Sequence, residues 1–419
     1  MSNPGQIIVV GGGLSAVAVA RELAAAGESV CLVGEPAPRP GRGHPVGWYS
    51  AWWPGDDRLL AAFGNESVDR LESVWADSGG AFALDRRGQV FVTADPDTAN
   101  ALRVAAGRLA GAGASVREHV SPEWYLPSPA SGFQGVPGGI DVFEGTALTT
   151  LLPFLSPRTA AAVQVRRAGM VDREGLRRWL AESFAREGGV TVRESPVAVE
   201  ALDEGHWEVV TPSGDRIRGR AVVVAGRRTR VFADLAGWDL VWDDWTRLVC
   251  RLGNAGSLLA PHRPMVASLD QDLLGLPASP FGELPASGLE APVLAAVGED
   301  LQVQVMLQHR IRAGDVAAVG QRLMAALEDL LPGLARRRGP PGNLTVTAAS
   351  FALAPDRRPL VGIADRRGGY VVAALSAGVS RVLGAARLAA DYLGGRSLGP
   401  LAPHLAPARL TLARQFPAG

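Results

Sequence analysis

The first 35 residues restrict the fold more than any other part of the chain. The apolar run "QIIVV" ends in a glycine cluster, "LSAVAVARELAAAG" has the apolar spacing of a helix, and "ESVCLVGE" contains a second apolar run. Gly11, Gly13 and Ala16 match the G-x-G-x-x-G/A pattern, in which small residues allow a tight turn, close approach of a pyrophosphate and close helix packing. This β-α-β unit predicts a dinucleotide site.

The helix after this turn would hold the phosphates with the free N–H groups of its first turn, which contains Leu14 and Ser15. Glu35, at the end of the second run, is the candidate partner of a ribose hydroxyl. It stands one place later than is usual, with Gly34 in the expected position. The alternatives are an exposed loop carboxylate at Glu35 and a purely structural glycine turn.

Composition excludes several other classes of protein. The 419 residues fit two domains, or one domain with a large insertion. The 42 basic and 42 acidic residues balance, so we expect neither nucleic acid nor a membrane as a partner. No lysine occurs, which excludes a Schiff-base amine.

The cysteines and the N-terminal sequence bear on the compartment. Cys31 and Cys250 stand far apart, which predicts neither a disulfide framework nor a metal site and suits a reducing cytoplasm. The sequence lacks the pattern of a secretion signal and has no apolar run of about 18 residues. We therefore expect a cytoplasmic protein without a metal.

Periodicity predicts several further elements. Helices are expected over 57–79, 96–113, 172–189 and 381–395, and strands within 190–202, 208–226 and 368–375. Residues 82–95 read as two strands joined by a turn at Gly88, and 122–140 as a long irregular connection.

Four segments together resemble the D-amino-acid oxidase family of flavoproteins, which includes glycine oxidase, sarcosine oxidase and dimethylglycine dehydrogenase. They are "VVGGGLSA", "VVVAG", "PDRRPLVG" and "SAGVSRVLGAARLAADYL". The resemblance implies a mixed α/β (α+β) fold with a discontinuous Rossmann-like FAD-binding domain and an inserted mixed β-sheet substrate domain. The expected ranges are 1–78, 166–235 and 346–419 for the first domain, and 79–165 and 236–345 for the second.

The same resemblance places FAD along named residues. The glycine turn would face the pyrophosphate, the backbone of Val197 the adenine, and Ala225 with Gly226 the adenosine half. The residues expected near the isoalloxazine are Gly362, Ser376, Gly378, Val379, Ser380 and Arg381, with Arg42 and Gly43 also on the cofactor.

Arg381 stands at the start of the last predicted helix. Two-electron reduction places negative charge near flavin N1 and the C2 carbonyl, where a helix N-terminus and a fixed positive charge would stabilise it. We therefore assign Arg381 a catalytic role, the alternative being a solvated surface arginine.

The stretch "GHPVGWYSAWWP" combines a histidine with four large aromatic side chains. In related dehydrogenases the "HPVG" pattern carries a covalent bond to the flavin, so His44 is either an attachment point, a non-covalent flavin neighbour or a plain loop residue. Trp48, Tyr49, Trp52 and Trp53 would enclose an amine or aryl substrate, or else fill the seam between the domains.

Two departures from the family bear on the substrate and the acceptor. Phe351 occupies the position of an arginine that clamps a substrate carboxylate, so the substrate is not a small free amino acid held in that way, unless His309, Arg310 or Arg312 supplies a clamp. Without a lysine above the flavin, His44 and His309 are the candidates for the charge that favours dioxygen, and oxidase and dehydrogenase stay open.

The leading hypothesis is an FAD enzyme that transfers a hydride from the carbon beside an amine nitrogen to flavin N5, with dioxygen or another electron acceptor. The substrate is a small molecule, larger than a simple amino acid or free of a carboxylate, of the kind found in specialised metabolism. The alternatives are a flavin-dependent hydroxylase or desaturase on a larger substrate, and a non-catalytic FAD-binding subunit of a dehydrogenase complex.

Overall fold

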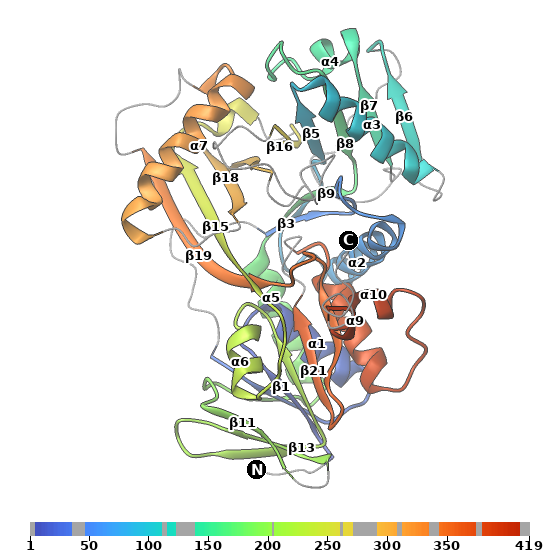
Figure 1. Cartoon of the computed structure of the whole chain (residues 1–419), viewed down its shortest axis with the longest axis vertical. Helices are drawn as coiled ribbons and strands as arrows, with labels where there is room; N and C mark the ends of the chain where they lie inside the picture. Colours follow the sequence, from blue (N-terminus) through green and yellow to red (C-terminus); the bar gives the residue numbers. More distant parts are fainter. Residues whose placement is uncertain are drawn as a thin grey trace.

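The computed structural model describes residues 5–35, 47–110, 115–122, 139–202, 205–259, 263–270, 291–307, 312–334, 343–373 and 379–410. Figure 1 shows two large bodies, one around β1 and α1 and the other around α7 and α3, with strands running between them. Each body is built on one large sheet. We describe the sheet that follows from the N-terminal pattern first.

The first sheet is six-stranded and mostly parallel. Its strands, in spatial order, are β10 (Val190–Val192), β2 (Val30–Val33), β1 (Ile7–Val10), β14 (Ala221–Ala225), β21 (Gly369–Ala373) and β20 (Leu360–Asp365). Only β20 runs antiparallel, against β21. The carboxyl ends of β1, β2, β14 and β21 therefore share one edge, where α/β sheets bind their ligands.

Both faces of this sheet are covered. Ile7 and Val9 point into a core shared with helices, whereas Ile8 and Val10 point into a second core beneath an antiparallel sheet. The helices are α1 (Leu14–Ala25), α2 (Arg58–Asp77), α5 (Arg173–Arg186) and α9 (Val382–Leu393). The antiparallel sheet consists of β11 (Ala198–Ala201), β12 (Trp207–Val210) and β13 (Arg216–Gly219), beside α6 (Thr229–Leu235).

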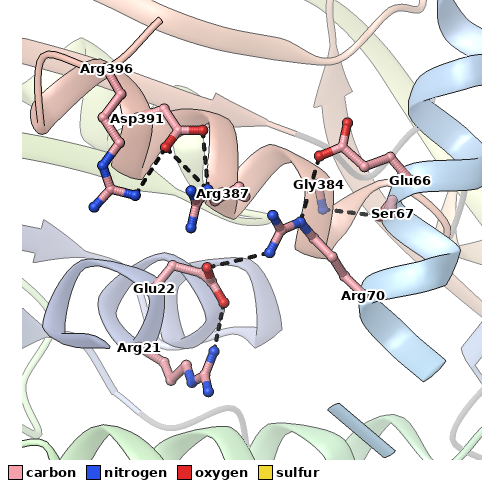
Figure 2. Close-up of polar contacts among 9 residues, drawn as sticks. All are labelled: Arg21, Glu22, Glu66, Ser67, Arg70, Gly384, Arg387, Asp391 and Arg396. Atoms are coloured by element: carbon pink, nitrogen blue, oxygen red, sulfur yellow. Dashed lines mark hydrogen bonds and ion pairs between the residues drawn. The ribbon is translucent and has the colours of Figure 1, made fainter. Parts of the chain in front are cut away.

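Helices α2 and α9 approach closely because Gly384 has no side chain. A Cβ at this position would lie 2.8 Å from Phe63 Cε2 and 3.0 Å from Ser67 Cβ. The Gly384 N–H donates to Ser67 Oγ at 3.0 Å, and Arg70 of α2 reaches Glu22 of α1 at 3.7 Å (Figure 2). These contacts fix the helix layer that presents the N-terminus of α9 to the site.

The second large sheet is nine-stranded and mixed. Its strands, in spatial order, are β19 (Leu344–Leu353), β15 (Asp243–Leu252), β18 (Asp300–Leu307), β17 (Val293–Val297), β16 (Met265–Ser268), β5 (Gln89–Thr93), β8 (Ala161–Val165), β7 (Ile140–Phe143) and β6 (Val116–His119). One face packs on α7 (Val316–Leu330) and α4 (Gly145–Leu151), and part of the other on α3 (Pro96–Ala110). Shorter helical elements include η2 (Gly256–Leu259), η4 (Ala313–Asp315) and α10 (Ala402–Leu405).

A three-stranded sheet, β3 (Gly47–Ser50), β9 (Ala168–Val171) and β4 (Leu84–Asp85), joins the two bodies. The prediction of two strands within 82–95 is confirmed, but they are not a pair. β4 pairs with β9, whereas β5 pairs with β8 and β16, because the residues that complete each sheet lie far along the chain.

The fold class expected from the sequence is confirmed, as are the four predicted helices. Asp57 and Asp172 cap α2 and α5, each accepting backbone N–H groups of the first turn. The expected domain boundary after residue 345 falls inside β19, which pairs along its whole length with β15. No helix among the described residues is long and apolar enough to cross a membrane.

Candidate active site

The turn between β1 and α1 has the geometry expected of a phosphate site. Gly11 has φ +141°, and a Cβ there would lie 2.2 Å from the carbonyl oxygen of Ala225. The N-cap of α1 is Gly13, which supplies no side-chain oxygen, and the first turn holds no acidic residue. The first N–H groups of the helix, which lack intrahelical partners, are therefore left for an anion.

Ser15 provides an independent test of whether a phosphate fits here. Its side chain is buried, and its Oγ has no hydrogen-bond partner among the described residues. A buried hydroxyl without a partner is costly unless a ligand supplies one. Leu14 and Ala16 are buried on the same turn. The residues present fit the pyrophosphate of a dinucleotide.

The neighbouring strand ends carry the other expected nucleotide contacts. Gly34 packs on the backbone of Gly11, where a Cβ would lie 2.5 Å from its carbonyl carbon, so the first residue free to carry a side chain is the exposed Glu35. Val197 already donates its N–H to Val210 at 2.8 Å, so a contact of its backbone with adenine would use the carbonyl oxygen. Ala225 is buried at the end of β14, and Gly226 follows with φ +101°.

The chain before α9 is tied to the aromatic stretch. Val379 donates its N–H to the carbonyl of Trp48 at 2.8 Å, and the N–H of Ser50 donates to Ser380 Oγ at 2.8 Å. These bonds join segments 330 residues apart. The aromatic stretch and the chain before α9 therefore lie together.

Arg381 is the N-cap residue of α9 and is paired with Asp56, both side chains being at most 4% exposed. It is not a solvated surface arginine. Burial raises the pKa of Asp56, while the charge of Arg381 opposes that rise. Asp56 thus offsets part of the positive charge that we predicted Arg381 would direct at a cofactor.

Gly362 lies in strand β20, beside the C-terminal end of helix α9. A Cβ at this position would lie 3.2 Å from the hydroxyl oxygen of Tyr392, near the C-terminal end of α9, and 3.4 Å from Pro407. The structure therefore does not bring Gly362 together with Arg381, which caps the opposite end of the helix.

The aromatic stretch divides between the two bodies. Trp48, Trp52 and Trp53 are at most 7% exposed and pack in the core of the nine-stranded sheet, where Trp52 and Trp53 contact the Phe91 ring edge-on. Tyr49 packs in the core of the helix layer. This is the arrangement expected of residues that fill the seam, and contact of Trp48, Tyr49 or Trp52 with a substrate stays a prediction.

One face of the nine-stranded sheet looks toward the first body. Along β15, Leu248, Cys250 and Leu252 belong to the core that includes α7, so Trp245 and Arg247 point to the opposite face. Phe351 pairs directly with Trp245 and is half-buried. Phe351 thus lies on the sheet face where a substrate-binding wall was expected.

Sequence reasoning missed four arginines near this face: Arg173, Arg227, Arg247 and Arg357. Arg357 has φ +61° and lies with its guanidinium carbon 5.1 Å from the Trp245 ring centroid. A left-handed backbone at a non-glycine residue costs about 1–3 kcal/mol.

Several predicted residues lie outside the described part of the chain: Arg42, Gly43, His44, His309, Arg310, Ser376 and Gly378. Arg312 is described and exposed, just before η4. Within the described ranges, no group of three or more His, Cys, Asp or Glu side chains is arranged to hold a metal.

Comparison with known proteins agrees with this geometry. The structure is similar to L-proline dehydrogenase from P. horikoshii, with a TM-score of 0.74, 16% identity and 99% of each chain covered. It is also similar to glycine oxidase from Geobacillus kaustophilus, with a TM-score of 0.69, 18% identity, and 95% of this chain and 97% of that chain covered. A third similar structure is iminodiacetate oxidase from Chelativorans sp. BNC1, with a TM-score of 0.68 and 16% identity, and with 96% of this chain and 99% of that chain covered. At 16–18% sequence identity, the similarity to these structures shows the fold alone.

No protein with a curated description matches the sequence. The family model described as "FAD dependent oxidoreductase" matches residues 6–240, which is more than half of the chain. The protein therefore belongs to the DAO family of FAD-dependent oxidoreductases and is an FAD enzyme acting on amines or amino acids.

Proposed function

We propose that the protein oxidises a carbon–nitrogen bond in an amine or amino-acid-derived substrate that is not a simple free amino acid. The observations that carry the proposal are the hydrogen bonds that join β3 to the chain before α9, and the pairing of Phe351 with Trp245 on the sheet face opposite α7. When bound, FAD supplies a hydride acceptor at N5. The similar structures are enzymes named for proline, glycine and iminodiacetate.

The chain's own residues account for the remaining requirements. Trp245 is fully buried and Phe351 half-buried, so this wall excludes water from an adjoining substrate. Desolvation favours the neutral amine, which has a free electron pair to support departure of the hydride. The α1 turn, with Ser15, holds the phosphates, and Glu35 the ribose.

The predicted roles of His44, His309 and Arg310 remain part of this proposal. His44 and His309 are candidates for the charge that governs reaction with dioxygen, and His44 also for covalent attachment of the flavin. Acid precipitation tests the latter directly. A yellow pellet identifies a flavin that is covalently attached to the protein. In the His44→Ala variant the yellow colour would then appear in the supernatant.

The deciding experiment is anaerobic mixing of the purified yellow protein with a panel of secondary amines and N-substituted amino acids, followed by flavin absorbance. Bleaching by an amine alone supports the proposal, and the rate of recolouring in air separates oxidase from dehydrogenase. A hydroxylase or desaturase would need a separate reductant. A non-catalytic subunit would hold FAD and never bleach, and a protein that refuses FAD would contradict the proposal altogether.

A further inference from the structure

Three arginines from three separate segments interact electrostatically, and none of them forms an ion pair with an acidic side chain among the described residues. Arg173 is the first residue of α5, Arg227 follows Gly226 at the end of β14, and Arg247 lies in β15. None of the three side chains makes a hydrogen bond or ion pair with another described residue, and the buried Nε of Arg247 has no partner in that part of the chain. By contrast Arg251, four residues further along β15, is paired with Asp300.

The three side chains influence one another electrostatically. Burial, followed by the charges of Arg173 and Arg227, lowers the pKa of Arg247 to about 10. Burial and then the charge of Arg227 lower the pKa of Arg173. Like charges that are partly removed from water and close enough to repel one another are unfavourable unless an anion compensates them.

The position of the cluster is that of the proposed substrate. A Cβ on Gly47 would lie 3.2 Å from Arg173 Cβ and 2.9 Å from Val379 Cγ2, so Arg173 stands at the junction of β3 with the chain before α9. Arg227 lies at the sheet edge where α/β folds bind their ligands. Arg247 projects from the sheet face opposite α7.

Strand register places Arg247 next to the site of the missing clamp. Trp245 pairs with Phe351, so Arg247, two residues along on the same face, is the diagonal neighbour of Phe351. Its direct partners are Met306 in β18 and Ala349 in β19, and the small side chain of Ala349 leaves room beside the guanidinium. A guanidinium is therefore present on the strand adjacent to the position that Phe351 occupies.

We propose that Arg247, assisted by Arg173 and Arg227, binds a doubly charged anionic part of the substrate, either a pair of carboxylates or a phosphate. The inference rests on the proposed function and specifies its substrate class. A single carboxylate would leave most of the cluster's charge uncompensated, whereas a dianion accepts hydrogen bonds from more than one guanidinium. The aromatic wall then faces the amine part of the same molecule.

Isothermal titration calorimetry on the full-length protein, with and without FAD, tests this with acetate, malonate and inorganic phosphate as probes. Malonate or phosphate should bind at least about tenfold more tightly than acetate, since each added charge-assisted contact contributes about that factor. Preference for malonate identifies a dicarboxylate site, and preference for phosphate a phosphate site. Equal binding of all three would overturn the inference.

Arg247→Gln should lower the affinity for the preferred dianion about tenfold while leaving acetate within about twofold. The matched control is Arg228→Gln, because Arg228 adjoins Arg227 but donates to Ser195 at 3.1 Å and lies over the Phe232 ring. If Arg247→Gln does not fold, the same titration is made with Arg227→Gln, because Arg227 is exposed. An unchanged affinity of the Arg227→Gln variant for the dianion would contradict the inference.

A loss of bound FAD in either variant, with dianion binding intact, would show that the cluster holds the cofactor phosphates and would likewise overturn the inference. Failure of the proposed function is distinguishable. In that case no amine bleaches the flavin, although malonate or phosphate still binds in an Arg247-dependent manner.

Discussion

The two large sheets use polar groups in opposite ways. The central strands of the six-stranded sheet, β1, β2 and β14, are wholly apolar and buried, and we propose that this sheet meets the cofactor through backbone groups at the strand ends. The nine-stranded sheet instead buries polar side chains, among them Gln89, Gln164, Asp141 and Gln302. One half of the site is therefore built from backbone, which tolerates no added atoms, and the other from side chains, which can be exchanged one at a time.

The largest effect should come from adding a methyl group to the backbone-built half. Gly11→Ala would place a Cβ 2.2 Å from the Ala225 carbonyl oxygen at φ +141°, so we expect loss of FAD binding and about 4–5 kcal/mol or more of stability. Flavin content and thermal unfolding measure both. The matched control is Gly27→Ala, also left-handed at φ +87° but in open space, which should cost only about 1–2 kcal/mol. Equal losses would show that crowding at Gly11 does not matter.

The second effect lies where the two halves meet. Asp56→Ala leaves Arg381 buried without its partner and should cost about 3–5 kcal/mol in denaturant unfolding. Adding Arg381→Met should recover much of this loss, because the unpaired charge is then removed.

Asp57→Ala is the control for the Asp56 substitution. Asp57 caps α2 and pairs with Arg358 at 2.9 Å, but it is more exposed, so its loss should cost about 1 kcal/mol. An Asp56→Ala variant no less stable than Asp57→Ala would mean that the buried pair contributes nothing to the junction.

A smaller effect distinguishes packing from substrate contact in the aromatic stretch. Trp52 Nε1 has no hydrogen-bond partner among the described residues, and the centroid of its ring lies 5.9 Å from that of the Phe91 ring. Trp52→Phe should therefore lower stability by about 1–2 kcal/mol without changing KM for the amine that bleaches the flavin.

Trp75→Phe is the matched comparison, since Trp75 lies on α2 and donates its Nε1–H to the carbonyl of Phe82 at 3.1 Å. The Trp75→Phe substitution should lower the free energy of unfolding by a similar amount, again with KM unchanged. A raised KM for Trp52→Phe alone, at unchanged stability, would show that Trp52 faces the substrate and not the seam.

The same contrast explains what the sequence could predict. The α1 turn depends on glycine spacing and helical periodicity within some 25 residues, and these are local properties. The pairing of Arg381 with Asp56 joins positions 325 apart, and the cluster of Arg173, Arg227 and Arg247 depends on strand register. A one-residue change in that register would turn Arg247 into the α7 core. Local patterns do not determine such contacts.

The smallest effect uses the two cysteines as reporters, one in each sheet. Burial raises the pKa of Cys31 in β2 to about 11 and that of Cys250 in β15 to about 12. At pH 8 both thiols are therefore almost entirely protonated, and alkylation by iodoacetamide should be far slower than in the unfolded chain. Because both pKa values are raised, the stability from these protonated thiols is complete below about pH 9 and falls as pH rises toward 11.

Removing FAD should accelerate labelling of Cys31 while leaving that of Cys250 unchanged, as mass spectrometry of each peptide would show. The reason is that β2 leads directly to Gly34 and Glu35 at the proposed nucleotide contacts, so bound FAD suppresses local opening there. Cys250 lies on the α7 face of the other sheet, with Val346 and Gly320 over it, and no cofactor contact covers that face. Labelling of both cysteines in unfolded protein supplies the reference rate. If FAD slowed the labelling of Cys31 and Cys250 equally, the two sheets would open as one unit. The two halves of the site would then differ in composition but not in local stability.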